Sequence, residues 1–158
     1  MAEFTHIDDE GRVRMVDVSE KPPTQRMAVA CGRITMNRET LENIRSSNVK
    51  KGNVLETARI AGVMAAKRAP DLIPMCHPIN ITHARVDFSA DTANNCIEIR
   101  SEVRTVGQTG VEIEAITGVA IAATTIYDMC KSYDRQMVIS DVRLVRKEGG
   151  KSRLFTAD

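Results

Sequence analysis

The spacing of apolar and polar residues predicts four strands and three helices between residues 26 and 145. Alternating positions rich in β-branched residues predict strands over 26–36, 81–89, 96–106 and 137–145. Helices are expected over 37–45, from a cap at Asn53 to about residue 69, and over 111–133. Residues 93–95 suit a hairpin turn, so the second and third strands should pair antiparallel.

This order of elements indicates an α+β fold. Strand, helix, helix, strand, strand, helix, strand is the split βαβ pattern of ferredoxin-like folds with one extra helix. It predicts an antiparallel sheet with helices packed on one face. With 158 residues the chain is long enough for one domain, expected over 25–147. Residues 1–24 are polar and non-periodic and are expected to form a flexible N-terminal arm, and 148–158 a flexible C-terminal tail.

The expected helix over 111–133 is apolar on nearly all sides. A helix of this kind must be covered on every face, which a single small domain does not readily achieve. The sequence therefore predicts that another subunit covers one face of this helix.

Composition removes several classes of function. The formal net charge is +1, so no overall charge attracts nucleic acid or a membrane surface. Aromatic residues are 3% and Trp is absent, which leaves few rings for stacking on bases. No apolar run approaches the roughly 20 residues that cross a bilayer. Neither a nucleic-acid partner nor a membrane partner is expected.

The four cysteines are scattered and form no C-x-x-C pair, which predicts reduced thiols and a cytoplasmic location. Cys76, His77 and His83 could in principle bind zinc, but their spacing matches no common zinc pattern. We therefore expect no metal and no other cofactor.

Two prolines enclose a candidate site over Asp71–Pro78. Pro74 and Pro78 fix their own φ and hold the residues before them extended, which makes a stiff loop. Such a loop presents Cys76 and His77 to a ligand at little entropic cost. The prolines could equally do no more than end the preceding helix, with His77 as a packing residue.

Charged residues stand at both ends of the 111–133 helix. Glu112 and Glu114 lie at its start, where carboxylates also simply favour the helix dipole. Asp128 and Lys131 share a face at its end, as an ion pair or as a carboxylate that sets the pKa of an amine. Glu114 and Asp128 are about 21 Å apart along such a helix, so one small-molecule site would use both only across a subunit interface.

Several motifs along the chain resemble those of the MoaC family of molybdenum cofactor biosynthesis, the cyclic pyranopterin monophosphate synthases. The resemblance runs nearly from end to end. The motifs are Met15-Val-Asp-Val-Ser19, Lys51-Gly52, Thr57-Ala-Arg-Ile-Ala-Gly62, Ala65-Ala-Lys-Arg68, Asp71-Leu-Ile-Pro-Met-Cys-His-Pro78, Gly107-Gln-Thr-Gly-Val-Glu-Ile-Glu-Ala115, Thr125-Ile-Tyr-Asp-Met-Cys-Lys131 and Gly149-Gly-Lys-Ser152.

The resemblance implies a reaction and an assembly. The substrate would be 3′,8-cyclo-7,8-dihydroguanosine 5′-triphosphate, rearranged to cyclic pyranopterin monophosphate with release of pyrophosphate by a phosphorus-oxygen lyase. Ferredoxin-like subunits would form a hexamer, a trimer of dimers with active sites at the dimer interface.

The resemblance also implies roles for individual residues. Lys51, Asp128 and Lys131 would be catalytic, and the substrate would be held by Met75, Cys76, His77, Glu112, Ile113, Glu114, Arg26, Lys67 and Lys147. Proton transfers at neutral pH would call for amines with a lowered pKa.

A rival interpretation is a ligand-sensing module without catalysis, since ferredoxin-like domains also bind effectors in oligomeric regulators. This interpretation assigns no role to Lys51, His77, Asp128 and Lys131. Turnover of the cyclised triphosphate discriminates between an enzyme and a sensing module.

Overall fold

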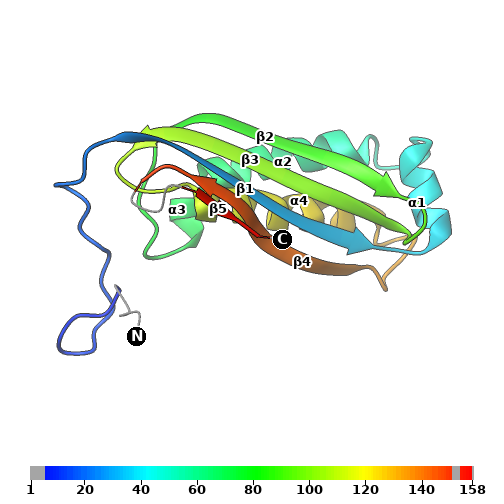
Figure 1. The fold of residues 1–158 in the computed structure, drawn as a ribbon. Helices are drawn as coiled ribbons and strands as arrows, with labels where there is room; N and C mark the ends of the chain where they lie inside the picture. The colour runs from blue at the N-terminus through cyan, green and yellow to red at the C-terminus, as the bar shows by residue number, and fades with distance from the viewer. Residues whose placement is uncertain (1–5, 151–153, 158) are drawn as a thin grey trace.

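A five-stranded antiparallel sheet with all helices on one face forms the body of the protein (Figure 1). The computed structural model describes residues 6–150 and 154–157. The sheet order is β2-β3-β1-β4-β5. The strands are β1 (Thr24–Thr35), β2 (Ile81–Asp91), β3 (Cys96–Gly107), β4 (Val138–Glu148) and β5 (Leu154–Thr156), and the helices are α1 (Arg38–Arg45), α2 (Val54–Lys67), α3 (Ala69–Leu72) and α4 (Glu112–Cys130). The order of the four long strands confirms the predicted ferredoxin-like fold.

The two predicted helix caps are present. The side-chain oxygen of Asn37 accepts a hydrogen bond from the backbone N of Thr40 at 2.7 Å. Asn53 accepts likewise from Glu56 at 3.1 Å. Each bond satisfies a backbone N–H that has no partner within the first turn of the helix, which fixes where α1 and α2 begin.

Helix α4 packs beside α2 on the same face of the sheet, with α4 against β1, β3 and β4 and α2 against β2. Ala115, Val119, Ala122 and Ile126 are fully buried. By length and hydropathy α4 could cross a membrane, but over half of it is buried inside the protein, as in a core helix. The sheet and α2 cover most of α4 within one chain, so its apolar character does not by itself require another subunit.

Two glycines allow the close approach of α2 to α4. A Cβ on Gly62 would lie 2.9 Å from the carbonyl oxygen of Gly118 and 3.1 Å from Val86 Cγ2. A Cβ on Gly118 would lie 2.8 Å from the hydroxyl of Ser101 on β3. Side chains at these positions would push the two helices and the sheet apart.

The structure contains two elements that the apolar pattern did not predict. Helix α3 follows α2 directly, with Pro70 in its first turn, where a missing N–H costs nothing. Strand β5 pairs with β4 within the expected tail, Lys147 opposite Phe155. The parts of the expected arm and tail at 1–5, 151–153 and 158, including Lys151 and Ser152 of the Gly149–Ser152 motif, lie outside the described residues.

The described part of the N-terminal segment, residues 6–23, contains one isolated bridge between Ile7 and Val13 and no helix or longer strand. It nevertheless contacts the body of the protein. The side-chain amide of Gln108, just after β3, donates to the carbonyl oxygen of Ser19 at 3.0 Å. The segment therefore lies along the loop between β3 and α4.

Candidate active site

A pocket of about 310 Å³ opens at the start of α4, where the loop after α3, the loop before α4 and the N-terminal segment meet. It brings together six of the predicted substrate-binding residues. The lining comprises His6, Val16, Val18, Lys21, Met75, Cys76, His77, Ile79, Thr109, Gly110, Glu112, Ile113 and Glu114.

Of the predicted loop over Asp71–Pro78, the first two residues belong to helix α3, and a tight turn follows at Pro74. Ile73, before Pro74, has φ −113° and ψ 108°, the extended conformation that the proline imposes. The backbone N of Cys76 donates to the carbonyl oxygen of Ile73 at 3.1 Å and closes the turn. The turn directs Met75, Cys76 and His77 to the pocket.

Glu114 and Cys76 form a buried pair at the pocket wall. Glu114 is 1% exposed, and Cys76 Sγ lies 3.5 Å from its Oε1 as a donor. Its Oε2 has no hydrogen-bond partner among the described residues. Burial raises the pKa of Glu114, and burial together with the Glu114 carboxylate raises the pKa of Cys76 to about 12. Cys76 is therefore a thiol at neutral pH and a poor nucleophile.

His77 is fixed by the N-terminal segment. Its Nε2 lies 2.7 Å from the carbonyl oxygen of Val16. Because a carbonyl oxygen only accepts, Nε2 must carry the proton. In the neutral ring the lone pair then belongs to Nδ1, so Nδ1 is the nitrogen able to take a proton.

Two cations lie close to the pocket. Lys147 on β4 forms an ion pair with Glu112. Arg26 on β1 donates to the carbonyl oxygens of Gly107 at 2.9 Å and Gln108 at 3.0 Å, at the start of the loop that leads into α4. Lys67 is exposed at the last position of α2 and is not part of the pocket lining.

The second group of predicted residues lies at the other end of α4. Lys131 Nζ donates to Asp128 Oδ1 at 2.6 Å, and Lys51 Nζ donates to the backbone oxygen of Asp128 at 2.9 Å, 3.8 Å from its Oδ2. All three side chains are about half exposed. The hydrogen bond from Lys131 lowers the pKa of Asp128, and the same bond raises the pKa of Lys131. The expectation of a lowered amine pKa is therefore wrong for Lys131.

The structure thus places the predicted residues in two groups rather than one. Glu114 and Asp128 lie 14 residues apart on the same helix, about 21 Å along its axis. None of Lys51, Asp128 and Lys131 belongs to the pocket lining at the start of α4.

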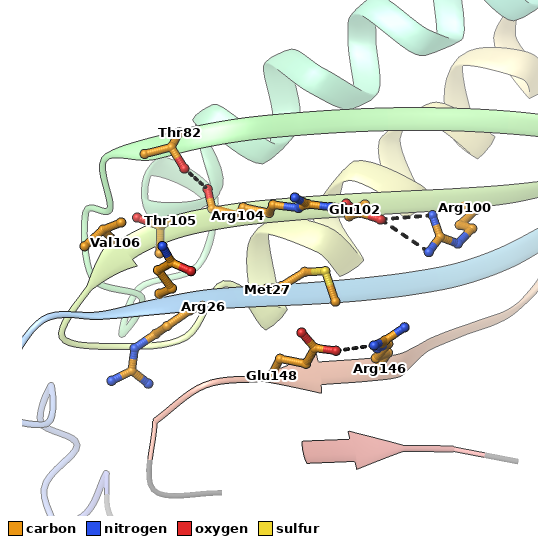
Figure 2. Close-up of a pocket in the computed structure, with 11 residues that line it drawn as sticks. Arg26, Met27, Thr82, Arg100, Glu102, Arg104, Thr105, Val106, Arg146 and Glu148 are labelled. Atoms are coloured by element: carbon orange, nitrogen blue, oxygen red, sulfur yellow. Dashed lines mark hydrogen bonds and ion pairs between the residues drawn. The ribbon is translucent and has the colours of Figure 1, made fainter. Parts of the chain in front are cut away.

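A larger pocket, of about 510 Å³, lies on the sheet face away from the helices (Figure 2). Its arginines are paired with carboxylates: Arg100 and Arg104 with Glu102, and Arg146 with Glu148. Arg26 also belongs to its lining, but its guanidinium points away from the other arginines (Figure 2). This pocket contains no other predicted site residue.

No group of three or more His, Cys, Asp or Glu side chains is arranged to hold a metal ion within residues 6–150 and 154–157. Sequence reasoning missed Val16, Val18 and Lys21, which line the pocket from a segment interpreted as a flexible arm. The motif Met15–Ser19 was the available signal, but its short apolar pattern does not indicate where the segment packs.

The fold and the pocket define a ferredoxin-like α+β protein with a candidate site at the start of its core helix. Comparison with known proteins identifies its family: the sequence model described as "MoaC family" matches residues 15–150, and the chain belongs to that family, as its motifs predict.

Three similar relatives are each named cyclic pyranopterin monophosphate synthase. That of Desulforapulum autotrophicum is 64% identical over 158 residues, which cover 100% of this chain and 97% of the relative. That of Roseiflexus sp. is 56% identical and covered in full in both chains. That of Thermoanaerobacter pseudethanolicus is 58% identical over 152 residues, 96% of each chain.

Proposed function

We propose that this protein is a cyclic pyranopterin monophosphate synthase of molybdenum cofactor biosynthesis. Its reaction converts 3′,8-cyclo-7,8-dihydroguanosine 5′-triphosphate into cyclic pyranopterin monophosphate and pyrophosphate, as a phosphorus-oxygen lyase. The observation that carries the proposal is the 64% identity over the whole chain to a relative of that name. A cytoplasmic location agrees with the four unpaired cysteines.

The pocket at the start of α4 holds the ring system and the ribose-derived part of the substrate. Glu114, whose buried Oε2 has no partner among the described residues, accepts a hydrogen bond from a ring N–H of the substrate. Nδ1 of His77 takes a proton from the ring being opened. Met75, Cys76 and Ile113 give the pocket its apolar wall.

The Lys51, Asp128 and Lys131 group supplies the remaining proton transfers. Since Asp128 raises the pKa of Lys131, that amine is protonated at neutral pH and serves as the acid. Lys51 also contacts Asp128, from a loop whose Lys50 N donates to the hydroxyl of Tyr133 at 3.2 Å. Asp128 thus holds two amines in fixed positions.

Arg26, Lys147 and Lys67 are the proposed partners of the triphosphate. A hydroxyl of the ribose-derived part attacks the α-phosphorus, the cyclic phosphate forms and pyrophosphate leaves. Fixed cations on the leaving phosphates stabilise the charge that develops. Arg26 and Lys147 are already held near the pocket by the Gly107 carbonyl and by Glu112.

The complete site forms between subunits, in a hexamer built as a trimer of dimers. The main support is the separation of the two groups along α4, which one small molecule does not bridge within one chain. Exposed apolar side chains on one face of α2, Ile60 at 61% and Met64 at 47%, also favour burial against another copy.

Turnover tests the proposal against the rival ligand-sensing module. Purified protein is supplied with the cyclised guanosine triphosphate, and pyrophosphate and a fluorescent pterin after oxidation are measured. We expect both products in equal amounts, and their loss in Asp128→Ala. Saturable binding of the compound without either product would show a sensing module instead.

A further inference from the structure

Residues 15–21, called the strap below, form one wall of the pocket at the start of α4. Val16 and Val18 are half-buried and line the pocket, whereas Met15, Asp17 and Ser19 are exposed. This alternation is that of an extended segment with one face toward the pocket. The strap therefore packs against the pocket through Val16 and Val18.

Two anchors hold the strap in place from different parts of the chain. The first is the bond from His77 Nε2 to the Val16 carbonyl, 2.7 Å, and the second is the bond from the Gln108 amide to the Ser19 carbonyl, 3.0 Å. Between them, Asp17 accepts from the backbone N and the hydroxyl of Ser19. His77 is itself a pocket residue, so the strap and the site depend on the same contact.

The strap ends in a turn that brings Lys21 to the pocket. The backbone N of Lys21 donates to the carbonyl oxygen of Val18 at 3.0 Å, and Lys21 belongs to the pocket lining. Lys147 on β4 already neutralises Glu112, which lines the same pocket. Arg26 is held by the Gly107 and Gln108 carbonyls, beside the amide that anchors the strap.

We propose that Lys21 is a further substrate-binding residue, which contacts the β- or γ-phosphate of the triphosphate and is placed by the strap. This inference rests on the proposed function. The position suits it because Lys21 lines the pocket, while Arg26 binds the loop that leads into α4 and Lys147 binds Glu112 at the start of that helix. Fixed cations of this kind hold pyrophosphate before and after it leaves.

The test combines binding with turnover in the full-length protein. Calorimetric titration with guanosine triphosphate measures binding independently of chemistry, and guanosine monophosphate serves as the probe without β- and γ-phosphates. Lys21→Ala should weaken binding of the triphosphate by roughly 10- to 100-fold, the range for loss of a hydrogen bond to a charged group. The Kd of the variant for guanosine monophosphate should stay within about threefold of that of the parent.

Steady-state kinetics with the cyclised triphosphate should show the same weakening of substrate binding. Lys21→Ala should raise KM by roughly the same factor, and kcat should also fall, because the lost cation stabilises charge that develops on the leaving phosphates. Lys21→Arg keeps the charge and should recover most of the affinity. Arg14→Ala is the matched control, since Arg14 is exposed on the same segment and is not part of the pocket lining.

Unchanged binding of guanosine triphosphate by Lys21→Ala would overturn the inference. An equal loss for both nucleotides would also overturn it, because the residue would then act on the shape of the strap rather than on phosphate. Absence of turnover in the parent protein would instead contradict the proposed function, and the difference between the two nucleotides would still decide the role of Lys21.

Discussion

Glu114 is the carboxylate most removed from water among the described residues, although it stands in the first turn of α4, where acidic residues are usually solvated. Two physical effects oppose each other there. The helix dipole favours the carboxylate form, while burial disfavours it. Burial prevails, since the pKa of Glu114 is raised from its ordinary value of 4.5. Oε2 of Glu114 is buried without a hydrogen-bond partner among the described residues, which is energetically unfavourable. A bound substrate can supply the missing hydrogen bond.

Glu114→Gln should therefore change the pH dependence of stability. The folded state of the parent binds a proton more tightly than the unfolded state, so its free energy of unfolding falls as pH rises above about 4.5. Glutamine does not ionise and escapes this loss. The stability of the variant relative to the parent should therefore be higher at pH 8 than at pH 4. Urea unfolding at both pH values measures the gain, and an equal difference at the two would contradict it.

The same variant has a second readout at Cys76. The Glu114 carboxylate contributes to the raised pKa of this thiol, so its removal should lower that pKa and speed alkylation by iodoacetamide at pH 8. Cys130 is the control, because burial raises its pKa to about 11 without a contribution from Glu114. Peptide mass spectrometry distinguishes the two thiols, and equal acceleration of both would indicate loosening of the fold.

Lys51 and Lys131 are proposed to transfer protons rather than only to bind phosphate. Arginine keeps the charge but does not release its proton at neutral pH. Lys51→Arg and Lys131→Arg should therefore bind guanosine triphosphate nearly as well as the parent, while kcat falls by about 100-fold or more. Lys50→Arg is the control on the neighbouring residue. Near-normal kcat in either catalytic variant would reduce that lysine to an electrostatic role.

At the scale of elements, the sequence was sufficient to predict the structure wherever one short stretch of the chain determines it. Asn37 and Asn53 cap helices through bonds three residues away, and the turn at 93–95 joins β2 and β3 as its residues predict. Strand β5 escaped prediction because its three residues, Leu154–Thr156, are too few to show an alternating pattern, and the strap did because a partner distant in sequence holds it. Lys147 lies opposite Phe155 on β5, and His77 binds Val16 across 61 positions.

The crossing of α2 and α4 depends on a missing side chain. Gly62→Ala would place a Cβ 2.9 Å from the Gly118 carbonyl, where neither helix backbone can yield cheaply. We expect a loss of about 1–3 kcal/mol in the free energy of unfolding. Gly107→Ala is a matched control, since its Cβ would meet only Thr105 at 3.7 Å. Urea titration of both variants checks the difference, and equal losses would contradict the packing argument.

At the scale of the whole molecule, the fold could be predicted from the order of elements, whereas the division of the site could be only partly foreseen. The distance along α4 follows from helical rise alone, and the structure agrees with it. Within one chain α2 and the sheet cover much of α4, and the coverage of its remaining surface by a second subunit stays a prediction. The stronger support for a second subunit comes from the site, because its two groups of residues lie at opposite ends of α4.

Complementation between variants tests whether each site uses two chains. Glu114→Ala and Asp128→Ala, each inactive alone, are mixed under conditions that exchange subunits. In a mixed dimer one site then carries both changes and the other carries none, so random exchange should restore about a quarter of parental activity. Asp128→Ala mixed with Lys131→Ala is the control, because both residues lie in one group and every site keeps a lesion. No recovery in the first mixture, with mixed oligomers shown by mass spectrometry, would mean that Glu114 and Asp128 act within the same chain.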